Sequence, residues 1–202
     1  MDPRDDIRER IIGAASLLFA RYGYGKTSMA DIARDCDMSP GNLYRFFENK
    51  LDIASQIVRN SFDRTLQEQR KILDKANLGA GQCLTEYVLA EMEGTYHQLE
   101  EYPTLLDQAQ EVRVKRPLLV HEYLAGSRAL IAEILGKGVA SGEFHIDDIG
   151  QAAATIQAAT LRFRYPQLHT GLSLDDLTRE VQGVLAIMLD GLKPGQAAPP
   201  AA

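Results

Sequence analysis

The sequence predicts an all-α protein in which a small N-terminal helical domain is joined by one long helix to a larger helical domain. Apolar residues recur at three- and four-residue spacing along most of the chain, which is the pattern of a helix with one buried face. The later segments do not alternate polar and apolar residues as strands would, and Gly, Pro, Asn and Asp fall between the periodic segments. These observations indicate helices separated by turns.

The first expected helix spans Asp5 to Tyr22. Its apolar residues lie three or four positions apart and form one stripe, and Gly23 and Gly25 follow it as helix-ending residues. The stripe consists of Ile7, Ile11, Ala14, Leu18 and Tyr22.

A second, shorter helix is expected to begin at Met29. Ser28 and Asp31 have the spacing of a capping box, which satisfies backbone N–H groups at a helix start. The periodic pattern stops after Cys36. Asp37 then supplies a tight turn, because Asp is among the few residues that tolerate a left-handed backbone conformation.

A third helix is expected from Pro40 to Phe47. Ser39 is a good N-cap, and Pro suits the first helical position because it has no N–H to leave unsatisfied. Leu43 and Phe47 lie four residues apart and share the buried side of this helix, where we expect them to meet residues of the two helices before it. The expected small core consists of Phe19, Ile32, Leu43 and Phe47, and the outward side carries Gly41, Asn42, Tyr44 and Arg45.

The remainder of the chain predicts one long connecting helix and a series of helices after it. From Lys50 the apolar pattern continues to about Lys75 without Gly or Pro, so the connection between the domains should be stiff. Pro166 is expected to end or kink the helix before it. The other expected helices span residues 83–101, 103–115, 149–163 and 174–192. Between the second and third of these, a further helix starts at Pro117 and ends either at Gly136–Gly138 or at Gly142. We therefore divide the chain into domains 1–50 and 51–192 and a disordered tail, 193–202.

Composition narrows the class of protein. The net charge is −6, but residues 1–60 hold nine Lys and Arg and nine Asp and Glu, so the acidity belongs to the rest of the chain. A neutral N-terminal domain can still bind phosphate through well-placed cations and helix N-termini.

Cys36 and Cys83 are far apart and have no metal-binding spacing, and we expect neither a metal nor a cofactor. We expect no membrane span and no signal peptide, and hence a cytoplasmic protein.

Several motifs in the first quarter of the chain resemble the tetracycline-repressor (TetR) family of bacterial transcriptional regulators. They are Thr27-Ser28, Ile32-Ala33, Ser39-x-Gly41-x-Leu43-Tyr44-x-x-Phe47 and Lys50. A second, weaker likeness is Gly138-x-x-x-Gly142-Glu143-Phe144 followed by Asp147, which resembles a turn common in the ligand-binding domain of the family. The chain departs from the family pattern at Asp37, Pro40 and Asn42, where the family often has Gly, a basic residue and Thr.

The resemblance implies that residues 1–50 form a three-helix helix-turn-helix domain that binds a double-stranded DNA operator. Asn42 and Arg45 are the expected base readers, since Asn can pair with adenine and Arg with guanine in the major groove. Arg45 could equally hold a phosphate. Gly41 would let the backbone approach DNA closely, and Thr27, Ser28, Tyr44 and Lys50 would contact phosphates and position the domain. Lys26 could contact a phosphate or be a solvated loop lysine. The full set of expected DNA-binding residues is Lys26, Thr27, Ser28, Ser39, Pro40, Gly41, Asn42, Tyr44, Arg45 and Lys50.

The resemblance also implies that residues 51–192 bind a small-molecule effector and form a homodimer. The last two helices would pair with those of a second subunit, with Ala152, Ala159, Val184 and Met188 in the interface. An apolar, aromatic cavity with a few polar groups is typical of a small-molecule site, although each of its residues taken alone could be an ordinary core residue. The expected pocket residues are Tyr87, Met92, Tyr96, Tyr123, Arg128 and Phe163.

The predicted function is therefore a DNA-binding regulator, most simply a repressor that leaves a palindromic operator when its ligand binds. An enzyme is the alternative from another class, but the sequence offers no nucleophile with a base, no paired carboxylates and no phosphate-binding Gly loop. A thiol enzyme that uses Cys36 or Cys83 with a histidine stays open as a possibility. A third alternative is a DNA-binding or scaffolding protein without a ligand.

Overall fold

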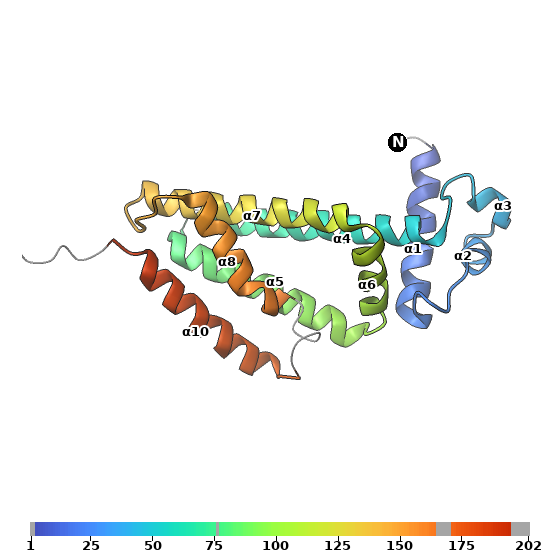
Figure 1. The fold of residues 1–202 in the computed structure, drawn as a ribbon. Coiled ribbons are helices and arrows are strands. Elements are labelled where there is room, and N and C mark those ends of the chain that lie inside the picture. The colour runs from blue at the N-terminus through green and yellow to red at the C-terminus, as the bar shows by residue number, and fades with distance from the viewer. Residues whose placement is uncertain (1–2, 76, 165–170, 195–202) are drawn as a thin grey trace, which may run out of the picture. The chain divides into compact units, whose positions relative to one another are not determined.

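The computed structural model describes residues 3–75, 77–164 and 171–194, and in these ranges it contains helices and no strands, as the sequence predicts (Figure 1). The helices are α1 (Pro3–Tyr22), α2 (Met29–Asp35), α3 (Pro40–Leu43), α4 (Lys50–Leu73), α5 (Ala80–Glu101), α6 (Leu105–Lys115), α7 (Pro117–Ala140), α8 (Ile149–Arg164) and α10 (Leu174–Leu192). None of these helices is both long and apolar enough to cross a membrane. Pro166 and most of the expected tail lie outside the described residues.

The packing divides the chain into two compact units. The first unit contains the chain up to Arg64 together with His97–Tyr123, and the second contains Thr65–Tyr96 together with the chain from Leu124 onward. The predicted functional boundaries at residues 50 and 192 stay predictions, because packing alone does not assign function.

The core of the first unit contains the four predicted residues Phe19, Ile32, Leu43 and Phe47, none more than 4% exposed. The sequence did not indicate that α6 also joins this core. Val112 of α6 is fully buried in it, and the Thr104 hydroxyl, just before α6, donates to the Ala20 carbonyl at 2.7 Å. The helix-turn-helix therefore packs as one body with a later helix.

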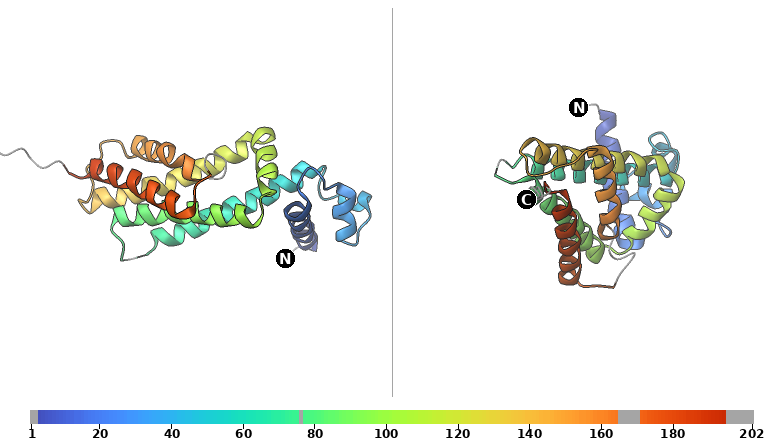
Figure 2. Two further views of the ribbon diagram at one scale, coloured as in Figure 1. Left: turned by 90° about the horizontal axis from the view of Figure 1, so that it is seen from below. Right: turned by 60° about the vertical axis from the view of Figure 1, so that its left-hand side comes forward.

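Most of the second unit is built around a separate apolar core, to which α5, α7, α8 and α10 contribute. Helices α8 and α10 lie side by side, as the further views in Figure 2 also show. Each of these helices places large, almost fully buried side chains in the core: Leu84, Met92, Ile131, Ile134, Leu135, Ile156, Phe163, Leu177, Val181 and Leu185.

Some predicted helix boundaries need correction. Helix α3 ends at Leu43 instead of Phe47, because the chain tightens into turns. In these turns the Arg45 N–H donates to the Asn42 carbonyl and the Phe46 N–H to the Leu43 carbonyl, each three positions earlier. Helix α6 starts at Leu105, since residues 103–104 form a turn.

Of the two ends predicted for α7, the structure has the later one. The helix continues through Gly136 and Gly138 to Ala140, and the chain reverses at Gly142, where φ is +76°.

The turn after α7 holds α5 in place. The Glu143 carboxylate accepts hydrogen bonds from the N–H groups of Ala80 at 2.6 Å and Gly81 at 2.8 Å. This carboxylate caps the N-terminus of α5, where the partial positive charge of the helix favours an anion. Helix α5 therefore begins at Ala80 rather than at Cys83, where the sequence predicts its start.

Phe144 fixes the same turn by packing on Gly138. A Cβ atom at Gly138 would lie 2.1 Å from the Phe144 ring and 2.9 Å from Cβ of Ala80. Only glycine leaves room for this contact, which explains the spacing of the Gly138-x-x-x-Gly142-Glu143-Phe144 motif.

We expect Gly138→Ala to lower the free energy of unfolding by about 1–3 kcal/mol, the usual range for overpacking a core. Gly136→Ala is the matched control, because the same helix has open space around that position. Gly136→Ala should leave stability unchanged or raise it by up to about 1 kcal/mol, since Ala favours helix over Gly. Thermal or urea unfolding measures both, and equal stabilities for the two variants would contradict the packing role of Gly138.

Candidate functional site

A tight turn between α2 and α3 sets the direction of α3. Asp37 has φ of +52°, and it is the one residue other than glycine with positive φ in the described ranges. The Met38 N–H donates to the carbonyl of Ala33 at 2.9 Å and closes the turn. The prediction of a left-handed turn at Asp37 is confirmed.

Helix α2 begins with the predicted capping box. The Asp31 N–H donates to the Ser28 hydroxyl at 3.1 Å, and the Ser28 N–H donates to the Asp31 carboxylate at 3.0 Å. The hydrogen bond from the Ser28 hydroxyl is the main cause of the lowered pKa of Asp31, and the Arg34 guanidinium acts in the same direction. Ser28 thus fixes the start of α2. It also belongs to the expected set of DNA-binding residues.

Helix α3 also begins as predicted. The Asn42 N–H donates to the Ser39 hydroxyl at 3.2 Å, and Pro40 occupies the first helical position. Gly41, Tyr44 and Arg45 are exposed, while Asn42 is half-buried. The predicted base readers therefore lie close together in the chain, Asn42 on α3 and Arg45 in the turn that follows it.

Lys50 and Thr27 point their polar groups into the protein. The Lys50 ammonium donates to the carbonyls of Tyr24 at 2.5 Å and Thr27 at 2.7 Å, and it lies 4.2 Å from the centre of the Tyr24 ring. The Thr27 hydroxyl donates to the Gly23 carbonyl at 3.0 Å. Desolvation is the main cause of the lowered pKa of Lys50. Both side chains thus fasten the segment between α1 and α2, while Lys26 beside them is exposed.

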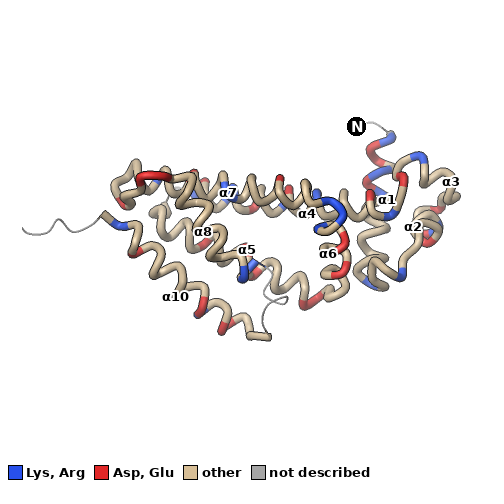
Figure 3. Tube along the Cα trace, in the orientation of Figure 1, with Lys and Arg blue, Asp and Glu red and all other residues tan. Residues whose placement is uncertain are grey.

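Charges of both signs are interspersed along α1 and α2, and α3 itself carries no charged residue (Figure 3). Any electrostatic attraction for an anion therefore depends on individual positions such as Lys26 and Arg45. Within the described ranges, no three His, Cys, Asp or Glu side chains gather in a way that could hold a metal ion.

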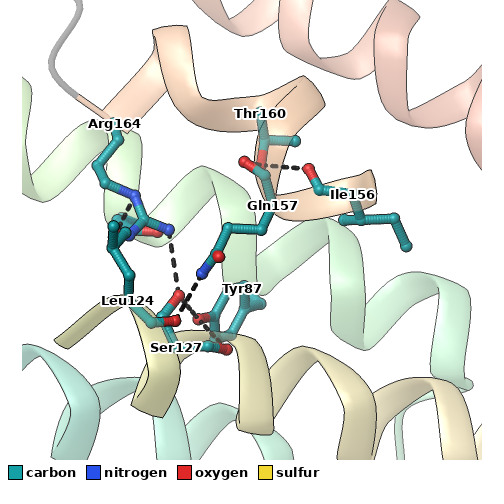
Figure 4. A network of polar contacts seen from close by, with 8 residues as sticks. Tyr87, Leu124, Ser127, Ile156, Gln157, Thr160 and Arg164 are labelled. Carbon is teal, nitrogen blue, oxygen red and sulfur yellow. Dashed lines mark hydrogen bonds and ion pairs between the residues drawn. The ribbon is translucent and has the colours of Figure 1, made fainter. Parts of the chain in front are cut away.

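The second unit contains a buried network of polar side chains (Figure 4). Arg164 of α8 forms an ion pair with Glu91 of α5, with 3.1 Å between Nε and Oε1, and it donates through Nη2 to the Ser127 hydroxyl at 3.1 Å. The Ser127 hydroxyl in turn lies 2.8 Å from the Tyr87 hydroxyl. Desolvation, followed by the nearby Glu91 carboxylate, raises the pKa of Tyr87 well above its usual value.

The predicted pocket residues fall in both packing units. Tyr87, Met92 and Phe163 lie in the core of the second unit, and Tyr96 packs against that core. Tyr123 belongs to the first unit, where its ring stacks on Phe62 with 4.1 Å between ring centres.

Arg128, another predicted pocket residue, is exposed. Its guanidinium donates twice to the Gln157 side-chain oxygen, at 3.1 and 3.0 Å. The Gln157 amide group in turn donates to the Leu124 carbonyl at 2.8 Å.

The sequence analysis missed Gln69, Glu91, Ser127, Gln157 and Arg164 as candidate ligand-site residues. Gln157 and Arg164 are seven residues apart and share the buried face of α8 with Ile156, Thr160 and Phe163. Polar residues on an otherwise apolar helix face are the sequence pattern that could have indicated a buried polar network. Their partners on other helices could not be assigned from the sequence.

The predicted dimer residues lie on α8 and α10. Ala159 is exposed, and Ala152, Val184 and Met188 are half-buried. Two large apolar side chains on the same helices are also exposed, Ile187 at 77% and Leu161 at 48%. These two helices therefore carry an apolar surface that a second subunit could cover.

Two family descriptions match this chain. Residues 11–57 match the one described as "Bacterial regulatory proteins, tetR family", and residues 80–185 match "Tetracyclin repressor-like, C-terminal domain". Together they cover both the helix-turn-helix and most of the second unit.

Individual relatives agree with these matches. The HTH-type transcriptional repressor KstR2 of Mycolicibacterium smegmatis is 26% identical over 94% of this chain and 92% of its own. The HTH-type transcriptional regulator HbdR of an Aromatoleum strain is 38% identical, over 33% of this chain and 30% of its own.

Solved structures share the fold. GusR of Salmonella enterica has a TM-score of 0.67 at 26% identity and covers 95% of this chain and 97% of its own. A TetR-family regulator from Mesorhizobium loti has a TM-score of 0.73 at 18% identity. The match covers 96% of this chain and 100% of the Mesorhizobium loti chain. Thermus thermophilus FadR, solved in complex with lauroyl-CoA, has a TM-score of 0.66 at 23% identity, also with 96% and 100% covered.

We expect Asp37→Val to lower the free energy of unfolding by about 1–3 kcal/mol, because a β-branched residue is strained at positive φ. Asp37→Gly should change it by no more than about 1 kcal/mol, since glycine adopts this conformation freely but gains entropy in the unfolded chain. Chemical unfolding measures the free energy of unfolding of both variants relative to the wild-type protein. Two equally stable variants would contradict a structural demand for positive φ at this position.

Proposed function

The chain belongs to the TetR family of bacterial regulatory proteins and is a DNA-binding transcriptional regulator, and from this premise we propose that it binds a palindromic operator as a homodimer, represses transcription there and leaves the DNA when a small-molecule effector binds. It acts on DNA in the cytoplasm. The observation that carries the proposal is the exposed side of α3, held at a fixed angle by the turn at Asp37.

The residues of the helix-turn-helix divide into those that read DNA and those that position the readers. Asn42 of α3 and Arg45 of the turn after it read base edges, because their side chains offer paired hydrogen-bonding groups. Gly41 allows close approach of the backbone to DNA. The side chains of Lys26 and Tyr44 contact phosphates.

The other expected contact residues position this surface. The hydroxyls of Ser28 and Ser39 cap α2 and α3, and Pro40 starts α3. The side chains of Thr27 and Lys50 hold the segment that precedes α2.

Homodimerisation is supported by the apolar surface on α8 and α10, which carries Ala152, Ala159, Val184 and Met188. A two-fold dimer presents two copies of α3 to two half-sites of DNA, about 34–36 Å apart or somewhat further. An operator read in this way has to be palindromic.

Release by an effector requires the ligand to prefer a conformer in which the two copies of α3 no longer fit the half-sites. A coupling free energy of about 1–3 kcal/mol is typical of such regulation. Helix α4 is one continuous helix from Lys50 to Leu73, so a tilt of this helix is a direct route for the change.

The function is tested by an electrophoretic mobility shift with the DNA upstream of the protein's own gene. The wild-type protein should shift this DNA in the presence of excess unrelated DNA. Arg45→Ala should bind target and unrelated DNA with more similar affinities, because a bidentate base contact contributes about 1–3 kcal/mol to discrimination. No sequence-specific shift at modest salt would rule the function out.

The salt dependence of DNA binding separates phosphate contacts from positioning residues. Lys26→Met should lower the slope of log K against log salt concentration by about 1, as expected for one lost phosphate contact. Lys50→Met should weaken binding without changing the slope, because its ammonium is bound to the Tyr24 and Thr27 carbonyls. Equal loss of slope in both variants would show that Lys50 reaches phosphate, the role that the family resemblance implies.

We expect Ile187→Asp to produce a monomer with weakened operator binding, because it places a charge in the proposed apolar interface. Leu118→Asp is the control, since Leu118 is 73% exposed, close to the 77% of Ile187, but lies in the first unit. Size-exclusion chromatography with light scattering measures the assembly state. A wild-type monomer at micromolar concentration, or an Ile187→Asp dimer, would contradict the proposed interface.

A further inference from the structure

The interior of the second unit holds five polar side chains that converge from four helices: Gln69, Tyr87, Glu91, Ser127 and Arg164, which we name the buried polar cluster. Gln69 is 2% exposed, Tyr87 1%, Ser127 0% and Arg164 5%. The Glu91 side chain is 8% exposed. All five lie within one packing unit, so their arrangement does not depend on how the two units are placed.

Four members of the cluster contact one another. The Ser127 hydroxyl accepts from Arg164, so its own hydrogen can go to the Tyr87 oxygen 2.8 Å away. The Tyr87 hydroxyl can then donate to the Ser127 carbonyl at 3.2 Å. Glu91 balances the charge of Arg164 through the ion pair, so the cluster is neutral overall.

Gln69 takes part in none of these contacts. Its amide lies beside the Tyr87 hydroxyl, yet neither its nitrogen nor its oxygen has a hydrogen-bond partner of normal geometry among the described residues. A buried amide without partners opposes folding, and Met would fill nearly the same volume without that cost. The polar group of Gln69 therefore has no role in folding that the structure reveals.

The surroundings of Gln69 define what could bind to it. Tyr87, beside Gln69, belongs to the same apolar core as Leu84, Met92 and Phe163. The amide of Gln69 offers N–H groups to an oxygen acceptor. A carboxylate would add an unbalanced negative charge to a buried cluster whose own charges, Glu91 and Arg164, already cancel, whereas a ketone, ester or thioester carbonyl would add none.

We propose that Gln69 recognises the neutral carbonyl oxygen of an otherwise apolar effector, with Tyr87, Ser127, Glu91 and Arg164 as positioning residues that fix the polar groups around it. The inference rests on the proposed function, since it gives the chemistry of the ligand to which the regulator responds. It assigns Gln69, a residue of α4, to the effector site.

The test uses the full-length protein and the variant Gln69→Met. Gln108→Met is the matched control, because Gln108 is also a buried glutamine, 2% exposed, with an unpartnered side-chain oxygen, but it lies in the first unit. The probes are methyl laurate, lauroyl-CoA and progesterone, which carry neutral carbonyls, with laurate and dodecane for comparison. Calorimetric titration measures binding, and thermal unfolding measures stability.

At least one neutral-carbonyl probe should bind the wild-type protein more tightly than laurate and dodecane do. Gln69→Met should lose about tenfold or more in affinity for that probe, the effect of one hydrogen bond to a buried polar group, while Gln108→Met stays within about twofold. Gln69→Met should unfold at the same or a higher temperature than the wild type, because it removes an unpartnered buried amide.

Three results would overturn the inference: no preference for neutral carbonyls, unchanged probe affinity in Gln69→Met, or a lower unfolding temperature for that variant, which would give the amide a role in folding. Each of these leaves specific DNA binding by the wild-type protein intact, and so leaves the proposed function standing. Absence of specific DNA binding, or failure of a tightly bound probe to release DNA, would instead count against the proposed function.

Discussion

The left-handed backbone at Asp37 sets the angle at which α3 leaves α2, and the presentation of α3 depends on that angle. The chain has only a few residues between the two helices, and the Met38 N–H is already committed to the Ala33 carbonyl. The capping hydroxyls of Ser28 and Ser39 fix where each helix starts. Local backbone geometry, rather than bulk positive charge, therefore prepares this neutral domain to meet DNA.

The second unit uses polar groups in a different way. A buried ion pair such as that of Arg164 with Glu91 contributes little net stability, because desolvation of the two charges offsets their attraction. An unpartnered amide at Gln69 adds a further cost of about 1–3 kcal/mol. Buried polar groups that do not stabilise the fold support the proposal that the second unit binds a ligand through them.

Local features of the fold could be predicted from the sequence, because short-range capping and turn chemistry determine them. Ser28 with Asp31, Asp37, and Ser39 with Pro40 behave as their residue types predict. Features that depend on distant contacts were missed. Val112 of α6 completes the first core, Glu143 caps α5 across 63 positions of sequence, and Gln69 meets the cluster from another helix. The inward direction of the Lys50 ammonium was missed for the same reason.

The central claim is that two copies of α3 in a symmetric dimer read a specific operator. Selection of bound sequences from a random pool of double-stranded DNA tests it most directly, because it assumes neither the operator nor the effector. The account predicts enrichment of one inverted repeat whose half-site centres lie about one helical turn of DNA apart or somewhat further. Recovery of no common sequence, or of a single half-site without its inverted copy, would contradict it.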